Sequence, residues 1–579
     1  MWNQTFGWFT QLKMFLPTTK SELTSLGWDK LDIILITGDS YIDSPYMGTT
    51  LIGKALVDRG YRVGIIAQPD FQSDKDITRL GEPELFWGVS GGAVDSMVAN
   101  YTALKKKRKS DDFTPGGINN KRPDRAVIVY SNLIRKYFKQ TKPIVLGGIE
   151  ASLRRVAHYD YWSDKIRKPI IFDAKADALV YGMGEKTIIQ LADAIKADKD
   201  YRTIRGLCYV GNDLPDDYLQ LPSFEEVTKQ KHKFVAMFHT FYQNNDPLTA
   251  KGLAQLVDTR YLIQNPPEAY MSQAELDKVY NLKYEHAQHP YYEKSGKVKA
   301  LDTIKFSITT HRGCYGECNF CAISVHQGKT IRWRSEASIL KEAKAFAKDP
   351  DFKGNIFDAG GPTANMYGFE CAKKLKSGSC TDKRCMYPEI CATLKPDHSR
   401  QLNLLKKMRK IEGIKKVFIA SGLRYDLILE DTKAGEKYMD NLLLHHTSGQ
   451  LKIAPEHTAG KVLDYMGKPK DWMLTAFSKM FQNSLKRTHT NKFLTYYLIA
   501  AHPGCTDQDM TELKQYASSN LKINPEQVQV FTPLPSTYSA LMYYTESDPF
   551  TGKKLFVEKN LQKKAAQKET LTRKKRYKQ

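Results

Sequence analysis

The chain has 579 residues, of which 41% are hydrophobic and 26% are charged. This length and apolar content predict two or three globular domains with ordinary cores. No apolar run approaches the roughly 18 residues that cross a membrane, and residues 1–17 lack the basic start, apolar core and cleavage site of a signal peptide. We therefore expect a soluble, cytoplasmic protein without a membrane partner.

The chain is strongly basic, with 87 Lys and Arg against 64 Asp and Glu and a net charge of +23. Such a balance favours anionic partners, for example nucleic acids or acidic protein faces. Part of the charge lies in residues 105–109 and in the segment from Lys553 onward, and runs like these are usually solvated loops or tails. Nucleic acid is therefore one partner class to test.

The first 204 residues alternate short apolar runs with helical stretches. Residues 48–59 place apolar side chains at helical spacing. The expected strands are residues 32–37, 62–67, 84–89, 126–130, 144–147 and 178–181. This alternation is typical of a doubly wound, flavodoxin-like α/β domain, which binds ligands at the carboxyl ends of its strands.

Several polar residues and glycines directly follow these strands. They are Asp39, Asp43, Gly91, Gly92, Gly148, Glu150, Arg154 and Arg155. Glycine pairs let a ligand approach the backbone closely, but all these residue types are also common in ordinary turns. The sequence leaves both interpretations open.

Residues 205–299 have weaker periodicity and more proline and tyrosine, as in Asn265-Pro-Pro267. Because paired prolines force an extended path, we expect this segment to bridge two domains and to form the wall of a cleft.

From residue 300 to residue 540 the α/β pattern returns with cleaner spacing. The expected strands are residues 304–309, 355–358, 416–420, 451–454, 493–500 and 528–531. The expected helices are residues 336–348, 401–411, 436–446, 471–485 and 508–520. About six βα units fall short of the eight of a complete barrel and predict a partial, TIM-like (βα)6 barrel. Residues 541–579 read as a basic C-terminal tail, disordered from about Lys559.

Seven of the nine cysteines lie between residues 314 and 391, which is typical of metal binding in a reducing compartment. Cys314, Cys318 and Cys321 form a C-x3-C-x2-C run after the strand 304–309. A four-iron cluster normally takes four thiolates, so three of them leave one iron open to an external ligand. Zinc, with His311, His326 or a distant residue as fourth ligand, and three metal-free thiols are the alternatives.

Four more cysteines follow the second expected strand of this half. Cys371, Cys380, Cys385 and Cys391 have the spacing C-x8-C-x4-C-x5-C. They are a complete ligand set for a second iron–sulfur cluster or for zinc, although the spacing is looser than that of a zinc ribbon. A reduced loop without metal is the alternative.

The C-x3-C-x2-C run, with the aromatic Phe320 before its last cysteine, resembles the signature of radical S-adenosylmethionine (SAM) enzymes. Over residues 21–544 the chain resembles the YgiQ-type radical SAM proteins. The matching runs are Thr37-Gly-Asp-Ser-Tyr-Ile-Asp43, Gly91-Gly92, Thr114-Pro-Gly-Gly117, Gly147-Gly-Ile-Glu-Ala-Ser152, Asn265-Pro-Pro267 and the cysteine core.

The resemblance implies a [4Fe–4S] cluster on Cys314, Cys318 and Cys321, with Phe320 packed beside it and SAM on the open iron. A turn after the second barrel strand, Gly360-Gly361, matches the place that binds the SAM amino group, although Pro362 replaces the usual acidic residue. By the same resemblance, Ser421 and Arg424 would meet the SAM carboxylate or ribose, and an arginine fork suits a carboxylate.

The order of the N-terminal domain resembles the cobalamin-binding domain of cobalamin-dependent radical SAM enzymes. Those domains that supply an axial histidine carry Asp-x-His-x-x-Gly after the first strand, where this chain has Asp39-Ser-Tyr-Ile-Asp-Ser44. Both the histidine and the glycine are missing. We therefore favour a flavodoxin-like domain that binds substrate or caps the barrel, and we do not expect cobalamin.

These observations predict a radical SAM enzyme that forms a 5′-deoxyadenosyl radical, with an electron donor such as a flavodoxin or ferredoxin and an open substrate. His445, His446, His457 and His502 are candidates for proton transfer. One alternative is methyl or methylthio transfer with cobalamin or an auxiliary cluster. Another is a non-catalytic iron–sulfur or zinc protein that binds nucleic acid.

Overall fold

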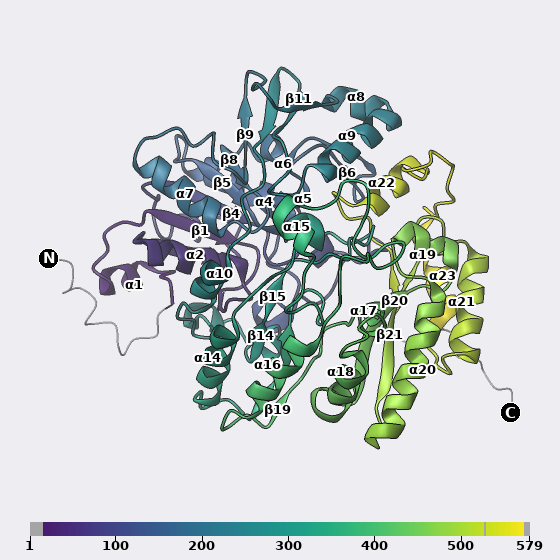
Figure 1. Ribbon diagram of the computed structural model, residues 1–579. Coiled ribbons are helices and arrows are strands. Elements are labelled where there is room, and N and C mark those ends of the chain that lie inside the picture. The colour runs from purple at the N-terminus through teal and green to yellow at the C-terminus, as the bar shows by residue number, and fades with distance from the viewer. Residues whose placement is uncertain (1–14, 526–527, 573–579) are drawn as a thin grey trace.

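The computed structural model describes residues 15–525 and 528–572, which form two α/β units in contact (Figure 1). The N-terminal unit, purple to blue in Figure 1, contains one large sheet, and the C-terminal unit, green to yellow, contains the barrel strands. Within the described residues, no helix is long and apolar enough to cross a membrane.

A five-stranded parallel sheet forms the core of the N-terminal unit. Its strands are β3 (Val63–Ala67), β1 (Ile33–Thr37), β4 (Phe86–Ser90), β5 (Ile144–Gly147) and β8 (Ala178–Val180), in that spatial order. Strands β1 and β3 are buried along their whole length, as expected for parallel strands covered on both faces. The order is that of flavodoxin-like folds, in which the strand order reverses between β1 and β4.

Four further strands extend this sheet through the segment that we expected to bridge the domains. They are β9 (Leu207–Gly211), β12 (Arg260–Gln264), β11 (Leu253–Val257) and β10 (Leu219–Leu221), which bring the sheet to nine strands. Later in the same segment, β13 (Ala287–Gln288) pairs with β2 (Ile42–Asp43). Another hairpin joins β6 (His158–Asp160) and β7 (Lys165–Arg167).

Helices surround the sheet. They are α1 (Lys20–Ser25), α2 (Gly48–Arg59), α3 (Ser96–Asn100), α4 (Ala126–Tyr137), α5 (Gly148–Leu153), α6 (Ile170–Asp173), α7 (Glu185–Lys196), α8 (Phe224–Lys229), α9 (Lys231–Gln243), α10 (Gln273–Tyr280) and α11 (Pro290–Glu293), with a 3-10 turn at Pro115–Gly117. The strand predicted at residues 126–130 is wrong, because these residues begin helix α4. Burial of Val127, Tyr130 and Ile134 follows a helical spacing, and a short apolar run alone cannot distinguish the two structures.

The C-terminal unit contains the six parallel strand positions of the predicted partial barrel. They are β14 (Ser307–Thr309), β17 and β18 (Asn355–Ile356 and Asp358–Gly360), β19 (Lys416–Val417), β20 (Gln450–Glu456), β21 (Phe493–Ala500) and β22 (Val528–Val530). β14 pairs with β18, β17 with β19, and β20, β21 and β22 with one another, all in parallel. A parallel bridge between Leu423, which follows β19, and Ile453 of β20 connects the first strands of the barrel with the last three.

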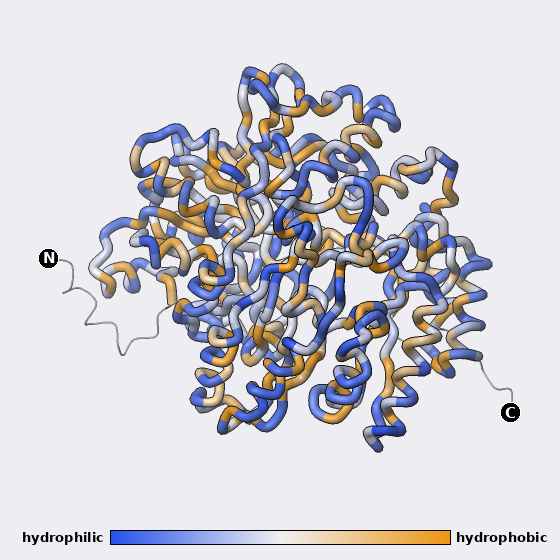
Figure 2. The backbone as a smooth tube through the Cα atoms, viewed as in Figure 1, coloured by the Kyte–Doolittle hydropathy of each residue, from blue (hydrophilic) through white to orange (hydrophobic). Residues whose placement is uncertain are grey.

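The helices of the C-terminal unit are α12 (Leu301–Ile304), α13 (Ile323–His326), α14 (Glu336–Ala347), α15 (Ala372–Ser377), α16 (Ser399–Arg409), α17 (Tyr425–Leu429), α18 (Gly435–Asn441) with a π-helical turn at Leu442–His446, α19 (Gly460–Met466), α20 (Asp471–Thr488), α21 (Asp507–Ser519), α22 (Tyr538–Thr545) and α23 (Leu561–Thr572). Five of them, α14, α16, α18 with its π-helical turn, α20 and α21, begin and end within a few residues of the expected helices. Along the helices at the right of Figure 2, hydrophobic and hydrophilic stretches alternate, as expected for helices with one face on a core.

The expectation of a disordered tail from Lys559 is wrong as far as Thr572, because helix α23 packs on α21 and β22. Leu571 and Lys564 are buried on this helix. The Lys564 ammonium donates to the Tyr543 hydroxyl at 2.9 Å and lies 3.4 Å from the Tyr161 hydroxyl of the N-terminal unit. The composition of the tail is polar, and even the buried face of the helix contains Lys564 and Gln567 beside Leu571. The basic residues 573–579 lie outside the described residues.

Candidate active site

The three cysteines of the C-x3-C-x2-C run lie in a loop between two short antiparallel strands, β15 (His311–Arg312) and β16 (Arg332–Trp333). The structure brings two of their thiols to the same glycine. The Gly316 amide donates to Cys314 Sγ at 3.4 Å, and a Cβ on Gly316 would lie 3.9 Å from Cys318 Sγ. A larger residue at this place would occupy the space between the two sulfurs.

The buried carboxylate of Glu317 fixes this loop from several directions. Lys329 pairs with it at 3.0 Å, and the Tyr242 hydroxyl of helix α9 donates to it at 3.3 Å. The Arg384 guanidinium, from the loop that carries the other cysteines, donates to the Glu317 carbonyl at 3.1 Å. Both the N-terminal unit and the second cysteine loop therefore hold the first cysteine loop in place.

The thiols of the loop lie in a buried setting. Burial, followed by the neighbouring cysteines, raises the pKa of Cys321 to about 12, and the same causes raise the pKa of Cys314. Thiols with raised pKa values are protonated at neutral pH, so a metal must displace protons when it binds. The positive charge of Arg424 favours the deprotonated thiolate, because its Nη1 lies 3.6 Å from Cys318 Sγ.

Arg424 is itself fixed by Asp426, which accepts from Arg424 Nε at 2.9 Å. Burial lowers the pKa of this guanidinium, but Asp426 and the two thiols raise it more, so the pKa lies above its ordinary value. The structure thus places Arg424 against the cysteine loop, whereas the resemblance assigned it to the carboxylate or ribose of SAM. An anion bound on the open side of a cluster at this loop would also lie near it.

The donor set fits a cluster with one open iron better than a closed zinc site. His311, one candidate fourth ligand, has one ring nitrogen 2.9 Å from Thr310 Oγ1 and the other 3.0 Å from the Thr363 carbonyl. Across residues 15–525 and 528–572, no three or more His, Cys, Asp or Glu side chains are arranged to hold a single metal ion. His326, the second candidate, instead lines the cavity described next.

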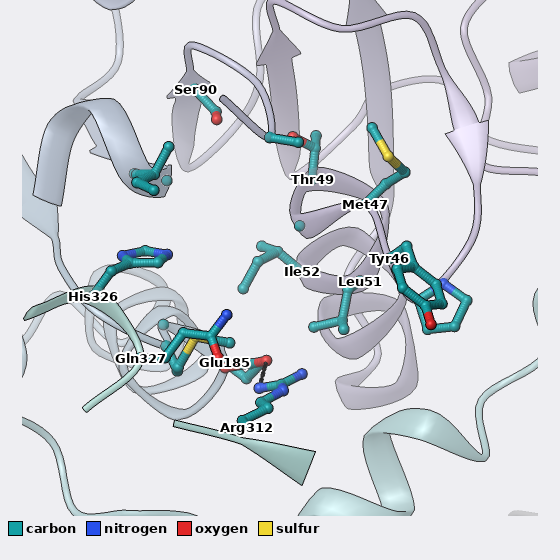
Figure 3. A pocket seen from close by; sticks show the side chains of 18 of the residues that line it. Tyr46, Met47, Thr49, Leu51, Ile52, Ser90, Glu185, Arg312, His326 and Gln327 are labelled. Atoms are coloured by element: carbon teal, nitrogen blue, oxygen red, sulfur yellow. Dashed lines mark hydrogen bonds and ion pairs between the residues drawn. The ribbon is translucent and has the colours of Figure 1, made fainter. Parts of the chain in front are cut away.

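A cavity of about 510 Å³ lies between the two units, at the carboxyl ends of strands from both (Figure 3). Its volume is within the range of pockets that bind drug-sized molecules. Much of the lining is apolar, with Leu51 and Ile52 of helix α2 pointing into it. Its polar edges form two rims, which we call the barrel rim (His311, Asp358, Gly361, Ser421) and the N-terminal rim (Asp39, Ser90, Gly92, Gly148).

Three of the predicted SAM residues line the cavity on the barrel side, namely Gly361 and Ser421 of the barrel rim and the neighbouring Gly360. The Asp358 carboxylate organises this rim, since it accepts the Ala420 amide at 2.8 Å and also contacts the Ser421 hydroxyl. Gly361 lies against the His311 ring, where a Cβ would come within 2.6 Å of Nε2. The turn therefore requires glycine at position 361, because the ring is held by hydrogen bonds on both nitrogens.

The N-terminal rim contains Asp39, Gly92 and Gly148 from the residues that follow the strands. Gly92 has a φ of +109°, and a Cβ there would lie 2.3 Å from Asp39 Oδ1. The Ala93 amide donates to Asp39 at 2.6 Å, and the Arg122 guanidinium donates to it at 2.5 Å. Burial raises the pKa of Asp39 to about 6 although Arg122 lowers it.

The other polar residues of that group do not line the cavity. They are Asp43, Gly91, Glu150, Arg154 and Arg155. Asp43 pairs with Lys54 at 2.9 Å, and Arg155 is buried and bonded to Gln264 and Asn245. These residues therefore stabilise the N-terminal unit and its packing, which is the structural interpretation that the sequence left open.

An ion pair that the sequence analysis missed connects the two units at the cavity wall (Figure 3). Glu185, at the start of α7, accepts from Arg312 of β15 at 2.5 Å, and Arg312 also donates to the Tyr280 hydroxyl at 3.0 Å. Both charged residues are buried, and Glu185 Oε2 has no hydrogen-bond partner. A buried acceptor of this kind is available to a polar group of a bound molecule.

The histidines predicted for proton transfer do not line the cavity. His502 is fully buried, 2.7 Å from Ser539 Oγ, and its ring lies 6.3 Å from the Phe320 ring. His457 lies 3.6 Å from Cys505 Sγ, and burial lowers its pKa to about 4. His326 lines the cavity, its Nδ1 is without a partner, and burial lowers its pKa to about 4.

Three of the four cysteines of the second set lie close together. The Thr393 hydroxyl is 3.4 Å from Cys371 Sγ and 3.2 Å from Cys391 Sγ, and the Cys391 amide donates to the Cys385 carbonyl at 2.9 Å. Cys380 belongs to the same loop, but in the described part of the chain no hydrogen bond connects its thiol to the other three.

Sequence comparisons identify related proteins over nearly the whole chain. The radical SAM N-terminal family matches residues 15–307, and the radical SAM superfamily matches residues 308–517. A UPF0313 protein of Fusobacterium nucleatum is 60% identical over 563 residues, covering 97% of this chain and 99% of the relative. UPF0313 proteins of Thermotoga neapolitana and Thermotoga maritima are 47% identical over 566 residues, with the same coverage.

Two solved structures are similar at low sequence identity. The radical SAM methyltransferase TsrM from Kitasatospora setae, with cobalamin and a [4Fe–4S] cluster bound, has a TM-score of 0.49 and 14% identity over 89% of this chain and 78% of that one. The cobalamin-dependent SAM radical enzyme OxsB, with aqua-cobalamin bound, has a TM-score of 0.49 and 12% identity over 91% of this chain and 57% of that one.

Proposed function

Because this chain belongs to the radical SAM superfamily, among its UPF0313 proteins, we propose that it forms a 5′-deoxyadenosyl radical next to the cysteine loop and directs it at a substrate in the cavity between its two units. The superfamily implies a [4Fe–4S] cluster and SAM as cofactors. The main support for the proposal is that the cavity is continuous and extends from the glycine turn of the barrel to the N-terminal rim.

The cysteine loop is the proposed place of the cluster. Cys314, Cys318 and Cys321 would hold three irons, and the fourth would remain open for the amino and carboxylate groups of SAM. When bound and reduced, the cluster held by these three cysteines would supply the single electron needed to cleave the SAM sulfonium into methionine and a 5′-deoxyadenosyl radical. A flavodoxin or ferredoxin is the proposed source of that electron.

The residues of the barrel rim would bind and orient SAM. Carbonyl groups of the turn at Gly360 and Gly361 would accept from its amino group, and this turn can approach closely because it carries no side chain at either position. Ser421, held by Asp358, would contact SAM from the neighbouring strand end. Arg424 would pair with the SAM carboxylate and with the thiolates that it already faces.

The cavity would exclude water from the radical. The aliphatic side chains of α2 that face the cavity carry no hydrogen-bond donor. Burial lowers the pKa of His311 and of His326 to about 4 and so keeps both imidazoles neutral. A substrate with an apolar body and one hydrogen-bond donor fits this space, because the donor would reach the unpartnered Glu185 Oε2.

The test is SAM cleavage by the full chain, reconstituted with iron and sulfide under strict anaerobiosis. We expect 5′-deoxyadenosine to form on addition of a strong reductant and to disappear in a Cys314/Cys318/Cys321→Ala variant. Cys208→Ala, at a buried cysteine of β9, is the matched control and should retain cleavage. Absence of cleavage from protein that binds SAM and holds a reducible cluster on this loop contradicts the proposal.

Methyl transfer through cobalamin is a second candidate, favoured by one observation. Seven glycines line the N-terminal side of the cavity, among them Gly92, Gly148, Gly182 and Gly184, and leave room for a large planar group. The histidine that supplies the axial cobalt ligand in some cobalamin domains is missing after β1, so this chain cannot supply an axial histidine from that position. Incubation with hydroxocobalamin and gel filtration test this candidate, and a chain that retains no corrinoid contradicts it.

A further inference from the structure

The second cysteine loop is a long irregular segment that is nevertheless packed into the protein. Between the end of α15 at Ser377 and the start of α16 at Ser399 the chain forms only turns and bends. Met386 and Leu394 within it are buried in one apolar cluster with Cys371, and Cys385 packs against that cluster. Irregular segments longer than about 15 residues are uncommon in compact domains unless something holds them.

The three clustered thiols of this loop lie beside a buried cation. Lys374 Nζ is 3.7 Å from Cys385 Sγ, and it also donates to the Lys329 carbonyl at 2.7 Å and pairs with Glu370 at 2.9 Å. A group of thiolates that binds a metal carries net negative charge, and a buried ammonium stabilises it. Glu370 already pairs with this lysine, and the ammonium lies close enough to Cys385 to stabilise a thiolate there as well.

Tyr315 connects the two cysteine sets. It lies next to Cys314 in the chain, is fully buried, and belongs to the same apolar cluster as Cys371. The Lys374 ammonium lies 5.1 Å from the centre of its ring. Its hydroxyl has no hydrogen-bond partner, although a buried O–H group normally has one. This unused donor is a second and independent indication that a group with acceptor atoms belongs here.

We propose that Cys371, Cys385 and Cys391, completed by Cys380 from the same loop, hold a second iron–sulfur cluster, separated from the first by Tyr315. The unpartnered Tyr315 hydroxyl donates to a sulfur of this cluster. The same loop contacts the first cysteine loop through Arg384 and Glu317, so the two centres share one structural support.

The arrangement favours a cluster over a single zinc ion. Four thiolates on one zinc stand about 2.3 Å from the metal and therefore within about 4 Å of one another. In the described residues neither cysteine set has that close arrangement. Intervals of eight, four and five residues between the cysteines also lack the paired knuckles of a zinc ribbon.

The test measures iron, acid-labile sulfide and zinc in full-length protein reconstituted anaerobically with ferrous iron and sulfide. The Cys314/Cys318/Cys321→Ala variant should keep iron and sulfide in equal amounts and show the paramagnetic signal of a reduced cluster. The Cys371/Cys385/Cys391→Ala variant should lose the iron and sulfide of the second cluster and keep those of the first. Cys208→Ala is the matched control and should keep both.

Two results overturn the proposal. One is a folded Cys314/Cys318/Cys321→Ala variant, checked by circular dichroism, that takes up no iron. The other is zinc bound in its place and lost in the Cys371/Cys385/Cys391→Ala variant. Neither result depends on SAM cleavage, so the proposed function and the second cluster fail separately.

A conservative substitution keeps the test decisive if the triple variants do not fold. Cys391 is only partly buried, so Cys391→Ser should fold and should lower the iron content or change the paramagnetic signal of the wild-type protein. Unchanged iron and an unchanged signal contradict the proposal. Tyr315→Phe should lower the reduction potential of the second cluster, since hydrogen bonds to cluster sulfurs raise it. An unchanged potential contradicts the placement beside Tyr315.

Discussion

The two rims of the cavity are built on different principles. On the barrel rim the side chains are bonded to one another, as Asp358 is to Ser421 and to the Ala420 amide. On the N-terminal rim glycines leave space, and the carboxylate of Asp39 is turned toward Arg122 and away from the solvent. The barrel rim is thus suited to hold one cofactor in one orientation, whereas the N-terminal rim offers space for a bulky part of a bound molecule. The Glu185–Arg312 pair is where the two meet.

Glu185→Gln should have the largest effect on stability, because it leaves the buried Arg312 charge without its partner. Breaking a buried pair from one side costs about 3–5 kcal/mol. The measurement is the free energy of unfolding by denaturant. Glu84→Gln, in the exposed Lys30–Glu84 pair, is the control and should change the free energy of unfolding far less, because solvent screens an exposed pair. Equal effects of the two substitutions would show that the pair does not connect the units.

Gly361→Ala should weaken SAM binding with a smaller effect on the fold. The new Cβ would lie within 2.7 Å of three atoms of the His311 ring, and overpacking of this kind costs about 1–3 kcal/mol, or roughly 5- to 150-fold in the dissociation constant. Isothermal titration with SAM measures the change.

Gly422→Ala is the matched control for that substitution, because a Cβ on Gly422 meets nothing within 4 Å. It is on the same side of the barrel, one residue after Ser421. If both variants bind SAM as the wild type does, the turn at Gly361 is not part of the SAM site.

Buried histidines of the barrel and buried aspartates that follow β1 should respond to acid in opposite directions, with the smallest effect per group of the three changes. Burial lowers the pKa of His311 and His457 to about 4, so the unfolded chain binds more protons between about pH 4 and 6.5 and the barrel is more stable as pH rises through that range. Burial raises the pKa of Asp39 and Asp43 to about 6, so the contribution of these two aspartates to the stability of the N-terminal unit falls as pH rises from about 4 to 6.

Hydrogen exchange at pH 5 and pH 7, corrected for intrinsic rates, would measure this difference. Each buried histidine should cost the barrel about 1–2 kcal/mol on acidification. Amides of β20 and β21 should therefore lose protection at pH 5, while those of β1 and β4 should not. An equal loss in both sheets would contradict the opposite signs.

The architecture was predictable from the sequence wherever a signal is local. The six barrel strands and the motifs after them are visible because each strand is a short apolar run that ends in glycine or polar residues. Helix α4 was misassigned because its first five residues look like a strand, and only the burial spacing as far as Ile134 distinguishes the two.

The contacts within the site were harder to predict, because they join distant residues. Glu185 and Arg312 are 127 positions apart, and the turn that carries Glu185 gives no indication of its partner. The position of Arg424 after a strand is visible in the sequence, but no local pattern shows that its Nη1 faces Cys318. Helix α23 has no apolar stripe that a sequence pattern could reveal, because its buried face consists of Lys564, Gln567 and Leu571.

The way in which Glu317 is held has a thermodynamic consequence for assembly. One of its contacts comes from α9 of the N-terminal unit and another from the second cysteine loop, so docking of the two units contributes to the order of the loop that would load iron. Anything that binds the docked form more tightly than the open form stabilises docking by the same free energy. Filling the cluster and closing the interface are then one coupled equilibrium, and chain that lacks iron should expose its interface to proteases more often than loaded chain.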